Sequence, residues 1–209
     1  MKNARITTGV FLVFFFALIT EGSLYNDPAA MTGFADRTSF DITLPGIRLQ
    51  ADVEYAVYAP GTYPGNDLSG GSKYIYAYQI FNSSRPDIAI DFFSVGIISG
   101  ATVDTIYSDD TYGYIPESAI EPSMSNIFAQ SAGFIFAGES LDLKKWSSVL
   151  IFSSTYSPTI GFGTISGGGL CGMGDLATPS TVPEPATIVM IAPALLVLVN
   201  KSKKIKGTK

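Results

Sequence analysis

Short stretches of alternating apolar and polar residues, separated by turn formers, dominate the middle of this chain. Residues 51–58 (ADVEYAVY) alternate over their first four positions and then become apolar throughout. Residues 73–81 (KYIYAYQIF) set Phe81 on one face of a strand and three tyrosines on the other, Tyr74, Tyr76 and Tyr78. A period of two is typical of β-strands, and aromatic residues favour sheets. Both segments are therefore predicted strands.

Three further segments have the length and punctuation of strands: residues 88–95, 134–137 and 148–154, each bounded by Gly, Pro, Ser or Asp. Residues 59–72 contain several Gly and Pro and are expected to form an exposed loop. No long amphipathic helix is evident. We therefore expect an all-β domain over residues 24–170, an antiparallel β-sandwich of Ig-like or jelly-roll-like kind with seven to nine strands.

Composition excludes several classes of function. The chain has one cysteine, Cys171, and no histidine, so an intrachain disulfide, a histidine general base and a histidine metal site are ruled out. Residues 24–182 contain 6 Lys and Arg against 16 Asp and Glu, a balance of 6 − 16 = −10. This charge repels phosphate backbones, so no nucleic acid is expected as a partner. We expect Cys171 to be passive, with pairing between chains or lipid attachment as alternatives.

The N-terminus has the layout of a secretory signal peptide. Lys2 and Arg5 precede the apolar run 10–19, and the chain turns polar at Thr20. The apolar run is shorter than the roughly 20 residues that a membrane span needs. We expect residues 1–22 to be cleaved near Gly22 or Ser23, with an uncleaved N-terminal anchor as the alternative.

The C-terminus combines three features in a fixed order. Pro183, Glu184 and Pro185 come first, an apolar run at 186–199 follows, and a lysine-rich end at 200–209 closes the chain. The prolines keep the tripeptide extended, and the lysines favour a cytoplasmic end for a transmembrane helix at 186–199. Everything between the two apolar runs is then placed outside the membrane.

Residues 182–209 resemble the PEP-CTERM sorting domain. The resemblance implies an integral-membrane exosortase as partner, which recognises Pro183, Glu184 and Pro185 and removes the helix. It also implies delivery from the inner membrane to the cell surface or extracellular matrix, usually in Gram-negative bacteria that make exopolysaccharide. The segment 187–191 and Pro193 depart from the more usual Gly- and Leu-rich helix. A plain C-terminal tail anchor is the alternative. Residues 171–181, which follow several glycines, are expected to be a flexible linker.

Carboxylates are the remaining catalytic candidates. Their densest cluster is Asp109-Asp110 with Glu117 and Glu121, which we expect on a loop. Two of them could act as acid and base in glycoside cleavage, and the same loop could bind calcium, although no EF-hand pattern is present. A solvated acidic surface is the simpler interpretation. We expect no catalytic residues, no metal site and no cofactor.

Tyrosine rings offer apolar platforms to sugars when they are exposed. The loop candidates for carbohydrate contact are Tyr107, Tyr112 and Tyr114, whereas tyrosines within strands are expected to pack in the core. The acceptor pattern Asn82-Ser83-Ser84 is interpreted first as a turn.

The sequence thus predicts a non-enzymatic surface or extracellular-matrix protein, structural or interacting, that is sorted by an exosortase-type system and associated with exopolysaccharide. Two alternatives stay open: a secreted carbohydrate-active enzyme with a carboxylate pair, and a tail-anchored binding domain.

Overall fold

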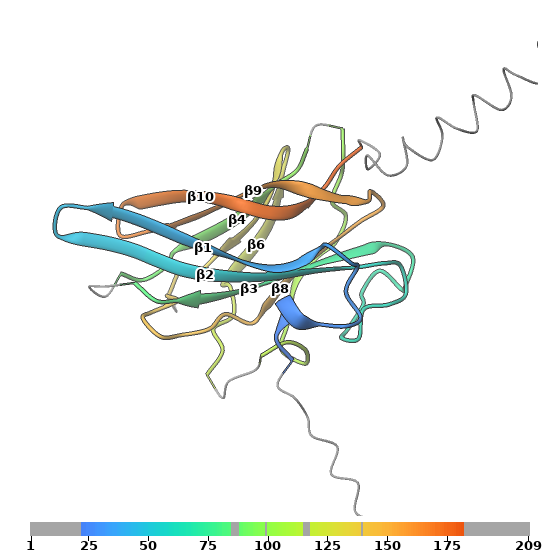
Figure 1. Ribbon diagram of the computed structural model, residues 1–209, viewed down its shortest axis with the longest axis horizontal. Helices are drawn as coiled ribbons and strands as arrows, with labels where there is room; N and C mark the ends of the chain where they lie inside the picture. The colour runs from blue at the N-terminus through green and yellow to red at the C-terminus, as the bar shows by residue number, and fades with distance from the viewer. Residues whose placement is uncertain (1–21, 85–87, 99, 115–117, 139, 182–209) are drawn as a thin grey trace, which may run out of the picture.

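The computed structural model describes residues 22–181, except 85–87, 99, 115–117 and 139. Within this part the chain forms one short 3-10 helix and ten strands (Figure 1). In chain order these are η1 (Leu24–Asn26), β1 (Ala35–Leu44), β2 (Ile47–Tyr58), β3 (Tyr74–Asn82), β4 (Phe92–Gly96), β5 (Ile106–Asp109), β6 (Met124–Phe128), β7 (Ser131–Ile135), β8 (Val149–Ser154), β9 (Pro158–Gly167) and β10 (Leu170–Pro179).

The strands form two five-stranded antiparallel sheets. Sheet one has the order β1-β2-β3-β8-β5, and sheet two has the order β10-β9-β4-β7-β6. The two sheets meet along one side where β1 lies beside β10, and the Thr38 hydroxyl donates to the Asp175 carbonyl. The predicted all-β fold is confirmed, its two antiparallel sheets are consistent with a β-sandwich, and the described residues contain ten strands instead of seven to nine.

The core lies between the sheets because alternate residues of each strand point inward. In sheet one, β2 and β3 contribute fully buried residues that include Val53, Val57 and Ile80. In sheet two, Phe93 and Phe134 are fully buried in the same cluster. Burying a side chain of this size stabilises the fold by about 1.5–3 kcal/mol. The period-two pattern in the sequence is therefore the pattern of this core.

Two tyrosines of β3 are fully buried in the core, as expected for tyrosines within strands. The Tyr78 hydroxyl donates to the Ala177 carbonyl at 2.6 Å, and the Tyr76 hydroxyl donates to the Tyr156 carbonyl at 2.8 Å. A buried hydroxyl without a partner costs free energy, so these bonds make the large rings compatible with the core. The first of them ties the middle strand of sheet one to β10 of sheet two.

The expected flexible linker at 171–181 is wrong. Most of these residues belong to β10, which pairs with β9 along its whole length. Glycines here allow close packing: a Cβ on Gly174 would lie 2.9 Å from the Phe40 ring and from the Thr38 methyl group. Gly168 and Gly169 have positive φ and form the tight turn between the two strands. The domain therefore extends past residue 170.

The other predicted strands were located with varying accuracy. The segments 51–58, 73–81 and 148–154 correspond closely to β2, β3 and β8. The segment 88–95 begins too early because β4 starts at Phe92, and 134–137 lies at the end of β7. At the expected turn, Asn82 is the last residue of β3, and its side-chain oxygen accepts a hydrogen bond from the Ser84 N–H at 2.9 Å, as in an Asx turn.

Asn82 is fully buried, and its amide donates to the Ile88 and Leu141 carbonyls, both at 2.7 Å. Asn82→Ala leaves both carbonyls without this donor, so we expect the free energy of unfolding to fall by about 2–3 kcal/mol. Ser83→Ala is the matched control, because the Ser83 hydroxyl lies 3.3 Å from its acceptor, and a change within about 0.5 kcal/mol is expected. Denaturant titration of both variants measures the difference. Equal midpoints for Asn82→Ala and the unchanged protein would contradict this role.

Candidate functional site

The outer face of sheet one is divided into a covered part and an open part. Over the covered part, the segment that contains η1 and the loops after β2 and β5 enclose a second hydrophobic cluster. Leu24 and Tyr58 are fully buried there, and Tyr63 is nearly so. The covering segment is fixed by its backbone, since the Met31 N–H donates to the Val57 carbonyl at 2.7 Å.

Two aspartates organise the covered part. Asp27 accepts hydrogen bonds from the hydroxyls of Tyr58 and Tyr112, which come from different segments of the chain. Asp109 accepts from the Tyr63 hydroxyl at 2.7 Å, and from the N–H groups of Asn66 at 3.0 Å and Thr111 at 2.8 Å. These aspartates hold the loops against the sheet.

Among the described carboxylates of the cluster expected from the sequence, Asp109 alone is buried, and hydrogen bonds to loops occupy it. Burial acts to raise the pKa of Asp109, but its hydrogen bonds outweigh burial, so the pKa lies below its ordinary value. Asp110 and Glu121 are exposed, and Glu117 lies outside the described residues. Across the part of the chain that the structure describes, no three His, Cys, Asp or Glu side chains are grouped so as to hold a metal ion. Asp109 therefore acts as a loop anchor.

The three candidate tyrosines do not share one surface. The Tyr107 hydroxyl donates to the Asn66 carbonyl at 2.7 Å, and Tyr112 bonds to Asp27, so both rings hold loops on the covered part. Tyr114 alone reaches the open part, where its ring lies 4.9 Å from the ring of Trp146.

An aromatic group occupies the open part of the face. The ring centroids of Phe81 and Trp146 are 4.8 Å apart with an interplanar angle of 31°, and Tyr114 flanks Trp146 at 58°. All three side chains are partly exposed. We call Phe81, Trp146 and Tyr114 the aromatic platform.

A change of register brings Trp146 onto this face. Tyr78 pairs with Leu150, whereas three residues further along β3 Phe81 pairs with Trp146, one position off the regular register. Ser147 already follows the shifted register, because its N–H donates to the Ile80 carbonyl at 2.9 Å and its hydroxyl accepts from the Ile80 N–H at 2.9 Å. The extra residue therefore lies between Ser147 and Leu150. A bulge of this kind re-aims side chains, and here it places the tryptophan beside Phe81.

Gln79 positions Tyr114, the third ring of the aromatic platform. Its side chain is fully buried, and its amide donates to the Ser147 carbonyl at 2.9 Å and to the Tyr114 carbonyl. The Gln79 side-chain oxygen accepts from the Tyr114 N–H at 3.1 Å. One carboxamide therefore binds the backbone on both sides of the platform and fixes the spacing of Tyr114 and Trp146.

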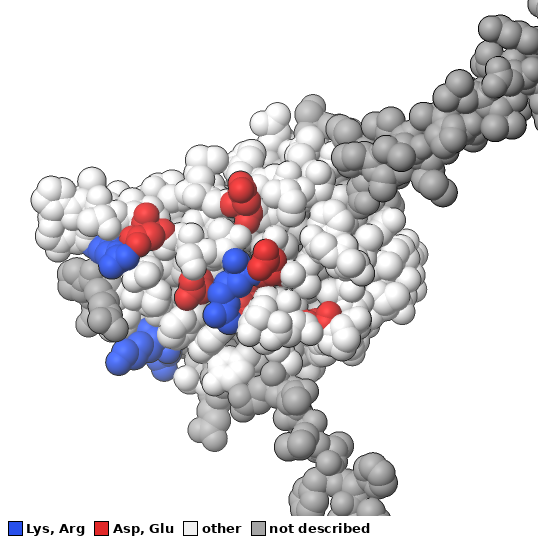
Figure 2. All heavy atoms as spheres, viewed as in Figure 1, with Lys and Arg blue, Asp and Glu red and all other residues white. Residues whose placement is uncertain are grey.

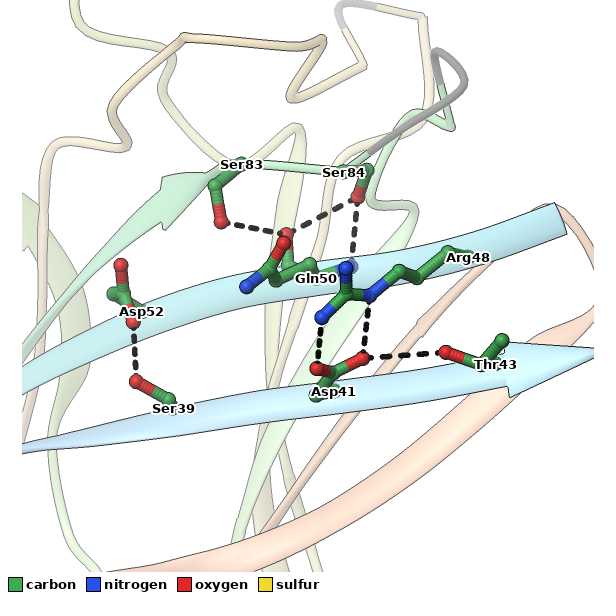
Figure 3. A network of polar contacts seen from close by, with 8 residues as sticks. All are labelled: Ser39, Asp41, Thr43, Arg48, Gln50, Asp52, Ser83 and Ser84. Carbon is green, nitrogen blue, oxygen red and sulfur yellow. Dashed lines mark hydrogen bonds and ion pairs between the residues drawn. The ribbon is translucent and has the colours of Figure 1, made fainter.

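Polar groups on β1 and β2 border the platform. Asp52 is the cross-strand partner of Phe81, and the Ser39 hydroxyl donates to its carboxylate at 2.5 Å. The next row contains Gln50, whose carbonyl accepts hydrogen bonds from the Ser83 and Ser84 hydroxyls (Figure 3). Carboxylate, amide and hydroxyl groups beside aromatic rings can bind the hydroxyls of a sugar while the rings contact its C–H groups.

Charge on the surface around β1 and β2 is sparse and balanced. Arg48 donates two hydrogen bonds to Asp41 on the neighbouring strand, and Arg37 pairs with the buried Glu54. Figure 2 shows a few scattered basic and acidic groups on one face, which is otherwise uncharged in the described part of the chain. Such a surface favours a neutral ligand.

Sequence reasoning missed Phe81, Trp146 and Asp52 as site residues. The alternation in residues 73–81 already places Phe81 on the face opposite the core tyrosines, and Trp146 is the only tryptophan of the chain. Their proximity depends on the bulge between Ser147 and Leu150, which has no clear signature in the sequence.

No protein-family model matches the chain, and neither a curated protein nor a solved structure matches it. Within the described residues, no helix has the length and apolar character required to cross a membrane. The predicted helix at 186–199 and the sorting residues Pro183, Glu184 and Pro185 lie outside those residues, as does the signal peptide apart from residue 22.

Tyrosine burial predicts the alkaline stability of the domain. Burial is the main cause of a raised pKa in seven tyrosines, Tyr55, Tyr58, Tyr63, Tyr76, Tyr78, Tyr107 and Tyr112, and it raises the pKa of Tyr107 to about 12. The unfolded chain releases these protons near pH 10. The stabilisation is therefore complete below about pH 10 and is lost as the pH rises further.

We expect the melting temperature to be level to about pH 9 and to fall steeply between about pH 10 and 12. Circular dichroism during heating measures this profile, and tyrosinate absorbance should rise together with unfolding. Tyr112→Phe removes one of the groups and should make the fall less steep. A melting temperature that stays constant to about pH 12 would rule out this burial of tyrosines.

Proposed function

We propose that this protein is an exported surface or extracellular-matrix protein whose β-sandwich binds a neutral polysaccharide through the aromatic platform. The observation that carries the proposed ligand is the partly exposed group of Phe81, Trp146 and Tyr114 beside Asp52. Export and sorting are supported by the sequence at the two ends. The protein is proposed to act by binding, without catalysis.

The platform suits a sugar for three reasons. Its rings differ in tilt, so that they can follow the curved surface of a pyranose chain. The Ser39 hydroxyl donates to one oxygen of the Asp52 carboxylate, and the proposed sugar contact uses the other oxygen. The balance of −10 over residues 24–182 makes the domain as a whole repel an anionic polymer, although the charges beside the platform are few and paired. A neutral glycan avoids that repulsion.

Delivery to the surface is the second part of the proposal. Residues 1–22 are proposed as a cleaved signal peptide, and Pro183, Glu184 and Pro185 as the sequence that an exosortase-type membrane enzyme recognises. The apolar run at 186–199 is proposed to span the inner membrane until processing. The sandwich lies between these two signals in the sequence, as an exported domain must.

Binding is tested by affinity electrophoresis in native gels that contain hydroxyethyl cellulose, xyloglucan or galactomannan, with alginate as an anionic comparison. We expect at least one neutral polymer to retard the protein and alginate to leave its mobility unchanged. Trp146→Ala and Tyr114→Ala should each reduce the affinity roughly tenfold, since a stacked ring contributes about 1.5 kcal/mol.

The matched control is Phe162→Ala, which removes a ring that is 50% exposed on sheet two. This variant should bind as the unchanged protein does. An equal loss of affinity in Trp146→Ala, Tyr114→Ala and Phe162→Ala would show that the polymer binds outside the aromatic platform. Absence of retardation by every neutral polymer would argue against the platform as a glycan site of this class.

Sorting is tested by intact mass of the protein from membrane and extracellular fractions of the producing cells. We expect an extracellular form that ends near Pro183–Pro185 and lacks residues 1–22. Substitution of Glu184→Ala should trap the longer form in the membrane fraction. If every molecule keeps Lys209 and stays in the membrane, the C-terminus is a plain tail anchor.

A further inference from the structure

The edge strand β6 differs from the other three edges of the described sandwich. β1 and β10 lie against each other and carry charges, and β5 contains Asp109, which is bonded to a loop. β6 (Met124–Phe128) contains no charged residue and no proline, and in the described part it pairs with β7 alone. Proteins commonly protect edge strands with charge, proline or a covering segment.

The side chains of β6 are unusually exposed for their apolar character. Met124 is 53% exposed, Ile127 is 41% exposed and Phe128 is 45% exposed. No charged residue lies between Glu121 and Glu139, so the β6–β7 hairpin is neutral throughout. An exposed, uncharged and apolar edge is a template for pairing with another strand.

The backbone geometry of β6 defines which groups are available. The hairpin has a two-residue turn, and Phe128 pairs with Ser131 next to it. Such a closing pair is hydrogen-bonded, and bonding alternates along an antiparallel ladder. The N–H and C=O groups of Ser125 and Ile127 therefore point away from β7.

We propose that β6 pairs antiparallel with β6 of a second copy, with the two-fold axis at Asn126. In this register Ser125 of one copy exchanges backbone hydrogen bonds with Ile127 of the other. Met124 then faces Phe128 of the other copy on the outer surface, so these two exposed apolar side chains meet, and Ile127 lies opposite Ser125. The two copies form one continuous ten-stranded sheet.

When two copies associate, their net charge favours contact at the β6 edge over contact elsewhere on the surface. Each copy has a balance of −10 over residues 24–182, so two copies repel wherever their carboxylates approach. The outward-facing positions of β6, β7, β4 and β9 carry no charge, so contact across β6 joins two uncharged faces of sheet two. This inference is independent of the proposed polysaccharide ligand, because the platform lies on the other sheet.

Cross-linking tests the register directly, with the full chain in a mild detergent. In a background of Cys171→Ser, Asn126→Cys places two thiols opposite each other on the axis. A non-hydrogen-bonded pair brings Cα atoms to about 4.5 Å, which suits a disulfide. We expect a dimer on a non-reducing gel after mild oxidation. Met173→Cys, 67% exposed on β10 of the same sheet, is the control and should stay monomeric.

Sedimentation velocity without cross-linking provides the second measurement. Ser125→Pro removes a donor that points away from β7, and Asn126→Lys puts two like charges on the axis. Each should weaken dimerisation at least roughly tenfold while the circular dichroism spectrum stays unchanged. Ile160→Lys, at a 48% exposed position on β9, should leave the dimer intact.

Three results would overturn the proposal. These are a monomeric unchanged protein, equal cross-linking at positions 126 and 173, and a dimer that Ile160→Lys dissociates but Asn126→Lys does not. The last result would show that copies associate through the face of sheet two instead of its edge.

Discussion

Burial of β3 on both of its faces is the constraint on which the rest of this structure depends. Its inward face places Tyr76 and Tyr78 in the core, and each hydroxyl donates to a backbone carbonyl that does not belong to the strands of sheet one. Its outward face begins with Ile75 and Ala77 beneath the covering loops. A strand that is buried on both faces suits the middle of a sheet, and β3 lies there between β2 and β8.

Gln79 marks the boundary between the covered and open parts of the outer face. On one side of it the tyrosines and the two aspartates hold loops against the sheet, and on the other side Phe81 and Trp146 are partly exposed. Because a buried carboxamide needs several partners, Gln79 is satisfied only when Ser147 and Tyr114 are both in place. The packing of the fold and the shape of the platform therefore depend on the same hydrogen bonds.

The fold class and the central strands could be predicted from the sequence because their signal is local. The alternation in residues 73–81 assigns each side chain of β3 to the correct face, including the core tyrosines. The β9–β10 hairpin was missed for a physical reason. Its glycines resemble a flexible segment in the sequence, but in the structure they make room for residues of β1 such as Phe40.

The candidate site is harder to predict from the sequence than the fold because it is built from contacts between distant segments. Of the three candidate tyrosines, Tyr114 joins the platform, whereas Tyr107 and Tyr112 hold loops through hydrogen bonds that no local pattern reveals. Trp146 reaches Phe81 only through a one-residue change of register. Long-range register of this kind is not encoded in a short window of sequence.

The central claim is that a glycan covers the open part of sheet one, and Trp146 is the sole tryptophan at that place. Acrylamide quenching of its fluorescence, measured with and without a neutral polysaccharide that retards the protein, tests this claim most directly. The account predicts moderate quenching of the free protein and clear protection by the polymer, with no protection by alginate. Retardation by a polymer that leaves the quenching of Trp146 unchanged would contradict it.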